Sequence, residues 1–137
     1  MILVDANVWI DVIQDDPTWG AWSAKELARA RNRDEVAINP IIAAEVSLAF
    51  ASPEDLDRYL GASLVQRLPL PYAAAFSAGR AFLRYRQGGG QRHSPLPDFY
   101  IGAHAEADGL TLLTRDTARY RTYFPAVRLI APKDETR

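Results

Sequence analysis

Short apolar runs, separated by longer segments with helical spacing, form the main pattern along the chain. The first run, Ile2-Leu3-Val4, has no polar alternation, which is typical of a strand covered on both faces. Strands that alternate with helices favour parallel pairing, so we predict a layered α/β fold. The segments expected to be strands or short extended pieces are residues 2–4, 36–38, 64–68, 110–114 and 127–130.

Helix start and stop signals lie between these runs. Ser52 precedes Pro53 and two acidic residues, which is a strong start signal, and Thr18 is placed to cap an earlier helix. The glycine run 88–90 and Gly109 are expected to end two helices. The helices expected are residues 7–13, 18–31, 40–50, one that begins after Ser52, 71–86, 98–108 and a short one that contains Tyr120 and Phe124.

The length and composition indicate one globular domain. The chain has 137 residues, of which 48% are hydrophobic and 24% charged, and such a chain can bury most of its apolar surface around one core. No internal repeat or domain boundary is visible in the sequence. We therefore expect residues 1–137 to form a single domain, with a frayed tail at about residues 132–137.

Two acidic residues bear on location. No basic segment precedes the first apolar run, and Asp5 interrupts it, so we expect no secretion signal. Glu45 interrupts the longest apolar stretch, which falls short of the roughly 20 residues that span a bilayer. These features lead us to expect a cytoplasmic protein.

Charge and residue types restrict the available chemistry. The net charge of −1 gives no overall attraction to nucleic acid, so phosphate binding requires a local basic patch or a bound metal. The chain has no cysteine, so metal ligands must be oxygen or histidine. The two histidines, His93 and His104, are too far apart to form a metal pair on one helix, and we expect core or surface roles for them.

Asp5 and Asp116 follow two of the predicted strands. In an open parallel sheet, ligands bind outside the carboxyl ends of the strands, so this topology places both acids at one edge. Each acid also precedes a predicted helix. A helix cap is therefore an equally good explanation for either residue alone.

Glu45 lies on the apolar stripe of its predicted helix. Spacings of three and four residues place it with Ile41, Ile42, Leu48 and Ala49. A carboxylate on this stripe points toward the core, where an ionised acid is costly unless it is paired or coordinates a cation. A purely structural role would need a buried basic partner.

Asp98 follows Pro97 at the start of a predicted helix and shares a face with Gly102 and Ala105. The small residues on this face would let the helix approach the sheet and bring Asp98 near the strand ends, although Asp98 also suits a helix cap.

Convergence of these four acids would require a cation. Two carboxylates about 4 Å apart repel by about 4 kcal/mol at an effective dielectric of 20, so a cation balances them or some stay protonated. Hard oxygen ligands favour Mg²⁺ or Mn²⁺ over zinc. Such a metal suits phosphodiester hydrolysis, because it activates a water and neutralises charge on phosphate oxygens.

Four segments follow one another along the chain, namely residues 2–11, Glu45 in an early helix, residues 97–105 and residues 113–116. In this order they resemble the PIN-domain family and most closely the VapC-type toxins of bacterial toxin-antitoxin pairs. The resemblance covers nearly the whole chain. It implies a three-layer α/β/α fold with a central parallel sheet of four to five short strands. It also implies Mg²⁺ or Mn²⁺ as cofactor and ribonuclease activity controlled by a tight-binding antitoxin.

The acidic positions of the family match the residues that we expect to be catalytic and to bind metal. Asn7 matches a polar position that in relatives helps to hold the first aspartate or a metal-bound water. Ala6 stands where relatives often carry Thr or Ser, which removes a hydroxyl contact but no metal ligand. The four acids are Asp5, Glu45, Asp98 and Asp116.

Basic residues near the acids are candidates for substrate binding. Arg84, Arg86 and Arg92 flank the glycine run, and together with Tyr85 they suit an RNA backbone and a stacked base. A solvated surface loop explains this segment equally well. Arg115 is a supporting candidate that would contact the scissile phosphate or balance the acids, and a surface salt bridge is equally compatible.

Trp19 and Trp22 lie one helical turn apart and form an apolar stripe. Core packing is the first explanation. Helices near the amino terminus of these toxins often form the antitoxin groove, so exposure of the two rings would instead mark a partner site.

The function expected from these residues and the resemblance is that of a metal-dependent endoribonuclease toxin. We expect a homodimer that an antitoxin holds inactive, with tRNA or rRNA as the RNA class. One alternative is a catalytically inactive RNA-binding or scaffolding PIN domain. Another is a phosphoryl-transfer domain with Asp5 as acceptor, but such domains need a second Asp two residues on, where Asn7 stands, or a characteristic lysine that is missing here.

Overall fold

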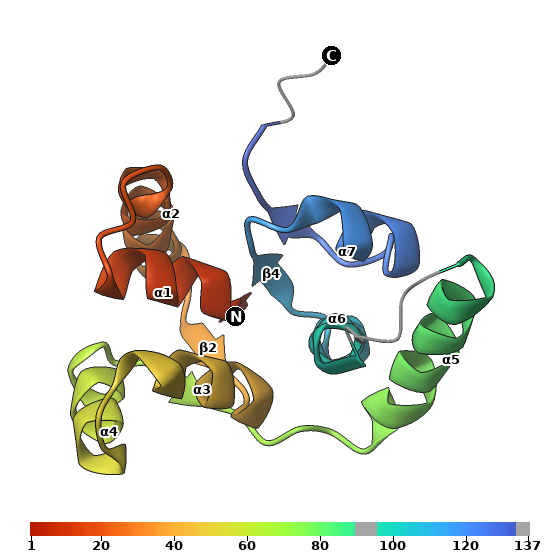
Figure 1. Ribbon diagram of the computed structural model, residues 1–137, viewed down its shortest axis with the longest axis horizontal. Helices are drawn as coiled ribbons and strands as arrows, with labels where there is room; N and C mark the ends of the chain where they lie inside the picture. Colours follow the sequence, from red (N-terminus) through yellow and green to blue (C-terminus); the bar gives the residue numbers. More distant parts are fainter. Residues whose placement is uncertain (90–95, 134–137) are drawn as a thin grey trace.

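A computed structural model describes residues 1–89 and 96–133 of the chain (Figure 1). In this part of the chain, five strands form one parallel sheet with the order β3-β2-β1-β4-β5. The central strand pairs on both sides, since Ile2 lies opposite Val36 and Thr111. The predicted parallel sheet is confirmed. The strands are β1 Ile2–Val4, β2 Val36–Ile38, β3 Gln66–Arg67, β4 Thr111–Leu113 and β5 Leu129–Ile130.

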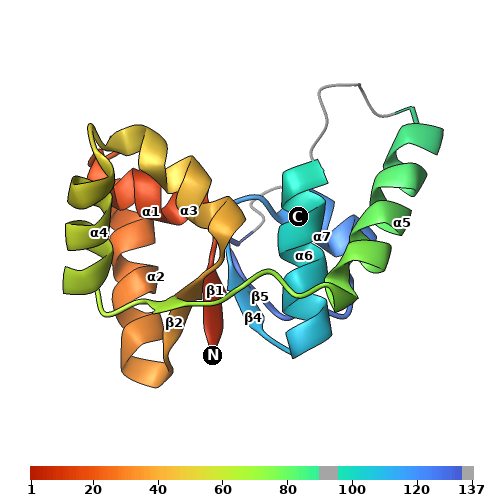
Figure 2. The same cartoon turned by 90° about the horizontal axis from the view of Figure 1, so that it is seen from below.

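Helices cover both faces of the sheet, which confirms the three-layer α/β/α fold. Helices α1 to α4 lie on one side of the strands, and α5 to α7 lie on the other (Figure 2). None of the described helices is long and apolar enough to cross a membrane. The helices are α1 Ala6–Ile13, α2 Gly20–Arg33, α3 Pro40–Val46, the 3-10 turn η1 Ser47–Ala49, α4 Pro53–Ala62, α5 Ala73–Gln87, α6 Leu96–Asp108 and α7 Thr117–Tyr123.

Several predicted helix ends are confirmed by their caps, and others shift. Ser52 Oγ accepts a hydrogen bond from the Asp55 amide at 3.1 Å, and Gly109 has a φ of +65°, as expected for a helix end. The cap predicted at Thr18 is wrong. Asp16 instead accepts from the amides of Thr18 and Trp19, so α2 begins two residues later than expected.

Other element boundaries also differ from the prediction, most by one or two residues. The helix expected over residues 40–50 becomes a 3-10 turn after Val46. The piece expected over residues 64–68 keeps only two residues as strand, because Leu64 has a φ of 54° and leaves the extended conformation. Helix α6 begins at Leu96, so Asp98 lies inside its first turn. The tail predicted to fray at about residues 132–137 falls, from residue 134 on, outside the described residues.

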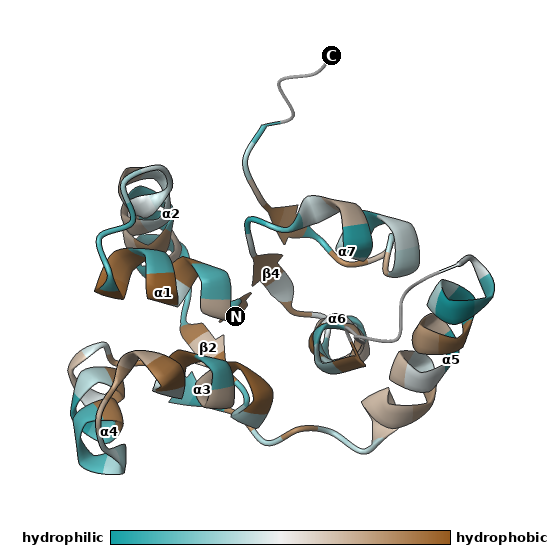
Figure 3. Cartoon of the chain, in the orientation of Figure 1, coloured by the Kyte–Doolittle hydropathy of each residue, from teal (hydrophilic) through white to brown (hydrophobic). Residues whose placement is uncertain are grey.

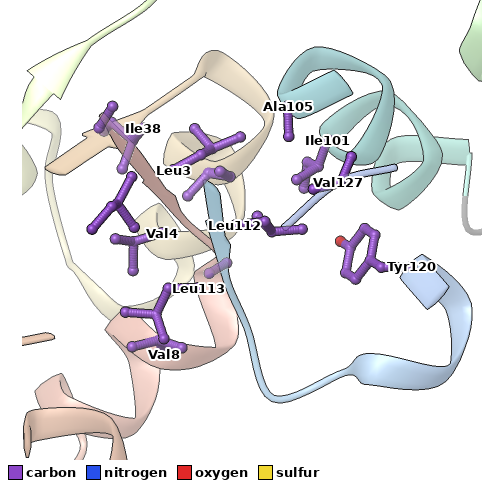
Figure 4. Packing of buried hydrophobic residues seen from close by; sticks show 14 of the residues in the cluster. Leu3, Val4, Val8, Ile38, Ile101, Ala105, Leu112, Leu113, Tyr120 and Val127 are labelled. Atoms are coloured by element: carbon purple, nitrogen blue, oxygen red, sulfur yellow. The ribbon is translucent and has the colours of Figure 1, made fainter. Parts of the chain in front are cut away.

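The core lies where the central strands meet the two helical layers. Leu3, Val4 and Leu112 are fully buried, and Figure 4 shows them near Ile101 of α6 and Tyr120 of α7. The hydrophobic colour of β4 and the hydrophilic stretches of the outer helices follow the same division (Figure 3). This packing fixes the ends of β1 and β4 side by side.

The strand order reverses next to β1. The chain runs from β1 out to β2 and β3, and then returns to β4 on the other side of β1. In open parallel sheets, a ligand binds at such a reversal, beyond the carboxyl ends of the two strands. Asp5 follows β1 and Asp116 follows β4 at this point.

Candidate metal centre

Asp5 is held at the end of β1 by four hydrogen-bond donors, of which three are side chains. Its Oδ1 accepts from the Ala6 amide at 2.8 Å, so the capping role considered for Asp5 is real. Its Oδ2 accepts from the hydroxyls of Thr114 at 2.9 Å and Tyr120 at 3.1 Å, with Asn7 Nδ2 at 3.5 Å. Burial raises the pKa of Asp5 from 3.8 to about 6, and the nearby Asp98 carboxylate adds to that rise.

Thr114 and Asn7 join the ends of β1 and β4. Thr114 Oγ1 accepts from Asn7 Nδ2 at 3.3 Å and from the Asp116 amide at 3.0 Å. Asn7 Oδ1 in turn accepts from the Arg115 amide at 3.1 Å. Asn7 therefore positions both strand ends. Sequence reasoning missed Thr114, although a polar residue that closes an apolar run just before Asp116 was a usable signal.

Glu45 of α3 has a buried carboxylate oxygen without a hydrogen-bond partner. Within the described residues, neither a hydrogen-bond donor nor a cation contacts its Oε1. Burial, together with the Asp98 and Asp5 carboxylates, raises the pKa of Glu45 from 4.5 to about 7. The buried basic partner that a structural role would need is absent from this part of the chain.

The apolar stripe predicted around Glu45 is only partly correct. Ile42 is fully buried, but Leu48 is 86% exposed. The helical spacing ends at Val46, and the tighter 3-10 turn rotates Leu48 away from the core. Glu45 itself is partly buried.

Asp98 and Asp116 share one cation, Arg119. Arg119 Nη1 donates to Asp98 Oδ2 and, at 3.2 Å, to Asp116 Oδ2. Burial and the Asp116 carboxylate raise the pKa of Asp98, against the opposing effect of Arg119. Asp116 occupies the N-cap position of α7, but its side chain makes no capping hydrogen bond. The capping alternative for Asp116 is therefore wrong.

Arg119 and Tyr120 were not predicted as site residues. Tyr120 is buried, and its burial and the surrounding carboxylates raise its pKa well above 10, so it remains a neutral hydrogen-bond donor to Asp5. The spacing of three residues between Asp116 and Arg119 on one helix was a signal for an ion pair. The contacts to Asp5 and Asp98 depend on how α7 packs, which the sequence pattern does not specify.

The four acids come from different elements and act on one another electrostatically. Asp98 raises the pKa of both Asp5 and Glu45, and Asp116 raises that of Asp98. Within the described part of the chain, no three acidic or histidine side chains already stand close enough together to hold an ion. The unpartnered Glu45 oxygen and the surrounding carboxylates nevertheless match the all-oxygen donor set of a hard divalent cation.

Arg115 does not point at the acids. Its guanidinium forms two bonds with the buried Asp11 carboxylate, at 2.6 and 2.9 Å, and lies 5.3 Å from the ring centre of Trp19. The Ser23 hydroxyl donates to the same carboxylate at 2.7 Å. Arg115 thus holds the loop before Asp116 against α1 and α2. This is a partly buried ion pair, where we had considered a phosphate contact or a surface pair.

The other basic candidates lie on α5. Arg84 is exposed, donates to the Tyr123 carbonyl at 3.4 Å and lies 6.0 Å from the Tyr123 ring centre. Arg86 is also exposed and lies 5.7 Å from the ring centre of Phe82. Within the described residues, neither arginine forms a hydrogen bond or ion pair with any of the four acids. Arg92 and His93 fall outside the described residues.

His104 has the core role expected of it, whereas of the tryptophan pair only Trp22 packs against the core. His104 is fully buried, its Nδ1 lies 3.1 Å from Asn39 Nδ2, and burial lowers its pKa. Asn39 also caps α3, the helix that carries Glu45. Trp19 and Trp22 are half-buried and pack edge to face, with ring centres 6.0 Å apart.

Comparison with known proteins places this fold. Residues 2–125 match the PIN domain. Among solved structures, VapBC2 from Rickettsia felis bound to a promoter DNA fragment is 21% identical, with a TM-score of 0.70 over 97% of this chain and 100% of that one. A toxin-antitoxin complex from Klebsiella pneumoniae is 23% identical, with a TM-score of 0.70 over 93% and 95%.

A third similar structure is FitAcB from Neisseria gonorrhoeae, which is 23% identical with a TM-score of 0.67 over 94% of this chain and 96% of that one. At these identities, the likeness concerns the fold. No curated protein sequence matches the chain significantly. The family match covers most of the chain. The chain belongs to the PIN domain family.

Proposed function

We propose that the chain is a metal-dependent endoribonuclease that cleaves RNA phosphodiester bonds at the acidic site that Asp5, Glu45, Asp98 and Asp116 would form. The observation that carries the proposal is the buried, unpartnered oxygen of Glu45 beside two further acids. A carboxylate in this position is costly unless a cation binds it. Membership of the PIN domain family supports a nuclease, since the family is typically one of nucleases.

The four acids would hold Mg²⁺ or Mn²⁺. When bound, such a cation lowers the pKa of water and neutralises charge on phosphate. The protein residues prepare the site for it. Thr114, Asn7 and Tyr120 fix the orientation of Asp5 by donating to Oδ2, and their removal would let that carboxylate rotate away from the pocket.

Substitution of single acids tests this proposal. With Mg²⁺ or Mn²⁺, the purified chain is expected to cleave RNA. Asp5→Asn and Asp98→Asn are each expected to lower the cleavage rate at least about 100-fold, because neutral amides bind a hard cation poorly. Gel assays of cleavage and circular dichroism of the fold provide the measurements.

The matched control is Asp57→Asn. Asp57 is exposed and pairs with Arg67 rather than with any of the four acids. The Asp57→Asn protein should therefore cleave RNA at the same rate as the unaltered protein. Unchanged cleavage in both Asp5→Asn and Asp98→Asn would refute the site. Retention of RNA without any metal-dependent cleavage would favour the alternative, an RNA-binding PIN domain without catalysis.

We further propose that the protein is the toxin of a toxin-antitoxin pair, acts as a homodimer and takes tRNA or rRNA as substrate. Similar folds occur in a toxin-antitoxin complex and in VapBC assemblies bound to DNA. A small neighbouring gene that encodes a DNA-binding protein would support this assignment. Co-expression should then yield a complex without ribonuclease activity, whereas an active complex would contradict inhibition by that protein.

A further inference from the structure

Arg119 is the one cation that directly contacts two of the four acids in the described part of the chain. A single nitrogen, Nη1, donates to the carboxylates of Asp98 and Asp116. The side chain is 27% exposed, and its guanidinium carbon lies 6.0 Å from the ring centre of Phe99. Arginine side chains carry a positive charge in proteins. Arg119 therefore places a positive charge directly against two of the four acids.

Among the described residues, Arg119 is paired with two of the four acids and not with the other two. Asp98 and Asp116 are paired with Arg119, whereas Asp5 is bonded to an amide and to neutral side-chain donors. Glu45 Oε1 has no partner in the described residues. One monovalent group thus balances half of the acids. A divalent cation that used all four would have to compete for the oxygens that Arg119 occupies.

We infer that Arg119 is an internal counter-ion that holds Asp98 and Asp116 when no metal is present and must release at least one of them for a divalent cation to bind. The inference rests on the proposed function, because it assumes that the four acids are the metal ligands. Arg119 stabilises the acids when no metal is bound. By thermodynamic linkage, the free energy of this stabilisation is subtracted from the free energy of metal binding. Arg119 would thereby set the metal concentration at which the enzyme becomes active.

Titration with Mn²⁺ alone tests the inference without an activity assay. The full chain, stripped of metal, is titrated by calorimetry as the unaltered protein, Arg119→Gln and Arg121→Gln. Arg121 is exposed on the same helix, so its substitution removes the same charge at a distance from the acids. Arg119→Gln is expected to bind Mn²⁺ roughly five- to tenfold more tightly, in keeping with a partly exposed charged hydrogen bond. Arg121→Gln should stay within about twofold.

The outcomes separate the inference from the proposed function. If the unaltered protein binds Mn²⁺ and Arg119→Gln binds it no more tightly than Arg121→Gln does, the inference is wrong and the metal site stands. If none of the three binds Mn²⁺, both the inference and the proposed function fail.

A nuclear magnetic resonance experiment keeps the test valid if Arg119→Gln does not fold. In the unaltered protein, addition of Mg²⁺ should shift the side-chain Nε–H resonance of Arg119, assigned with Arg119→Lys, because its carboxylate contacts change. The Arg121 resonance should stay in place. Saturation with Mg²⁺ that leaves the Arg119 resonance unmoved would overturn the inference.

Discussion

The four acids of the pocket differ in how readily they ionise. Burial, together with the neighbouring carboxylates, raises the pKa of Asp5 to about 6 and that of the partly buried Glu45 to about 7. Asp98 has a raised pKa that Arg119 partly counteracts. Without metal, some of these carboxyl groups are therefore still protonated near neutral pH, and metal binding must release their protons.

Glu45 should make the metal-free protein less stable as the pH rises. Its folded pKa of about 7 exceeds the ordinary value of 4.5, so the folded protein binds more protons than the unfolded chain between these values. The contribution of protonated Glu45 to the free energy of unfolding is thus fully present below about pH 4.5 and is lost as the pH rises through about 7. At about pH 8, Glu45→Gln should be more stable than the unaltered protein by about 1–2 kcal/mol, after allowance for solvent screening.

Urea denaturation in the presence of a chelator measures this difference. At about pH 4 the unaltered protein and Glu45→Gln should be nearly equally stable, because Glu45 is then largely protonated in both the folded and the unfolded chain. A Glu45→Gln protein that is less stable at the higher pH would show that Glu45 has a favourable partner. Saturating Mn²⁺ should reverse the order, since the cation stabilises only the ionised glutamate.

Individual residues of the pocket were predictable to different degrees. Asp5 and Asp116 could be predicted because they follow apolar runs, and Glu45 because it interrupts an apolar helix. Arg119 and Tyr120 could not. Their contacts with Asp98 and Asp5 depend on the rotation of α7 against α6, which a single sequence does not encode as a pattern.

At the scale of elements, α6 packs closely against the segment that follows α7. A Cβ atom on Gly102 would lie 2.4 Å from Cδ2 of the buried Phe124 ring. The small residue predicted to allow close approach is therefore needed, but its partner is Phe124 rather than the sheet. This contact sets the distance between the helices that carry Asp98 and Arg119.

Gly102→Ala should therefore destabilise the protein by about 1–3 kcal/mol, because the buried Phe124 ring would have to shift. Thermal denaturation measures the effect. Gly79→Ala is the control, since a Cβ there meets nothing within 4 Å on the exposed face of α5. It should stabilise the helix by about 0.5–1 kcal/mol. Equal effects of the two substitutions would contradict the close packing.

The Asp11–Arg115 pair connects α1 to the loop between β4 and α7. Asp11→Ala would leave the Arg115 guanidinium, 29% exposed, without its two bonds and should cost about 2–4 kcal/mol. Asp57→Ala, which removes an exposed pair, should cost at most about 1 kcal/mol. Urea denaturation compares the two, and equal losses would show that the Asp11 pair contributes no more than a surface contact.

Element boundaries were less predictable than element types. Apolar runs identified the positions of four of the five described strands, whereas β3 consists of the exposed polar residues Gln66 and Arg67 inside the piece expected over residues 64–68. The 3-10 turn after Val46 and the start of α2 at Gly20 were missed. The start of α2 depends on the Asp16 carboxylate, which accepts from the amides of Thr18 and Trp19, and apolar periodicity does not report on such bonds.

At the scale of the whole molecule, the strand order brings distant segments of the sequence together. Alternating strands and helices predicted a parallel sheet, but not that β1 would lie between β2 and β4. That order pairs the end of β1, which Asp5 follows, with the end of β4, which precedes Asp116, although the two acids are more than a hundred residues apart in sequence. The single domain, the cytoplasmic location, the homodimer and the antitoxin stay predictions.

Anomalous diffraction from crystals of the chain soaked in Mn²⁺ measures directly whether the four acids bind metal. An anomalous peak is expected among the carboxylates of Asp5, Asp98 and Asp116, with Glu45 in or next to the coordination sphere and Arg119 moved from its position between Asp98 and Asp116. A peak at a different place, or none at saturating Mn²⁺ with all four acids ordered, would contradict the metal centre.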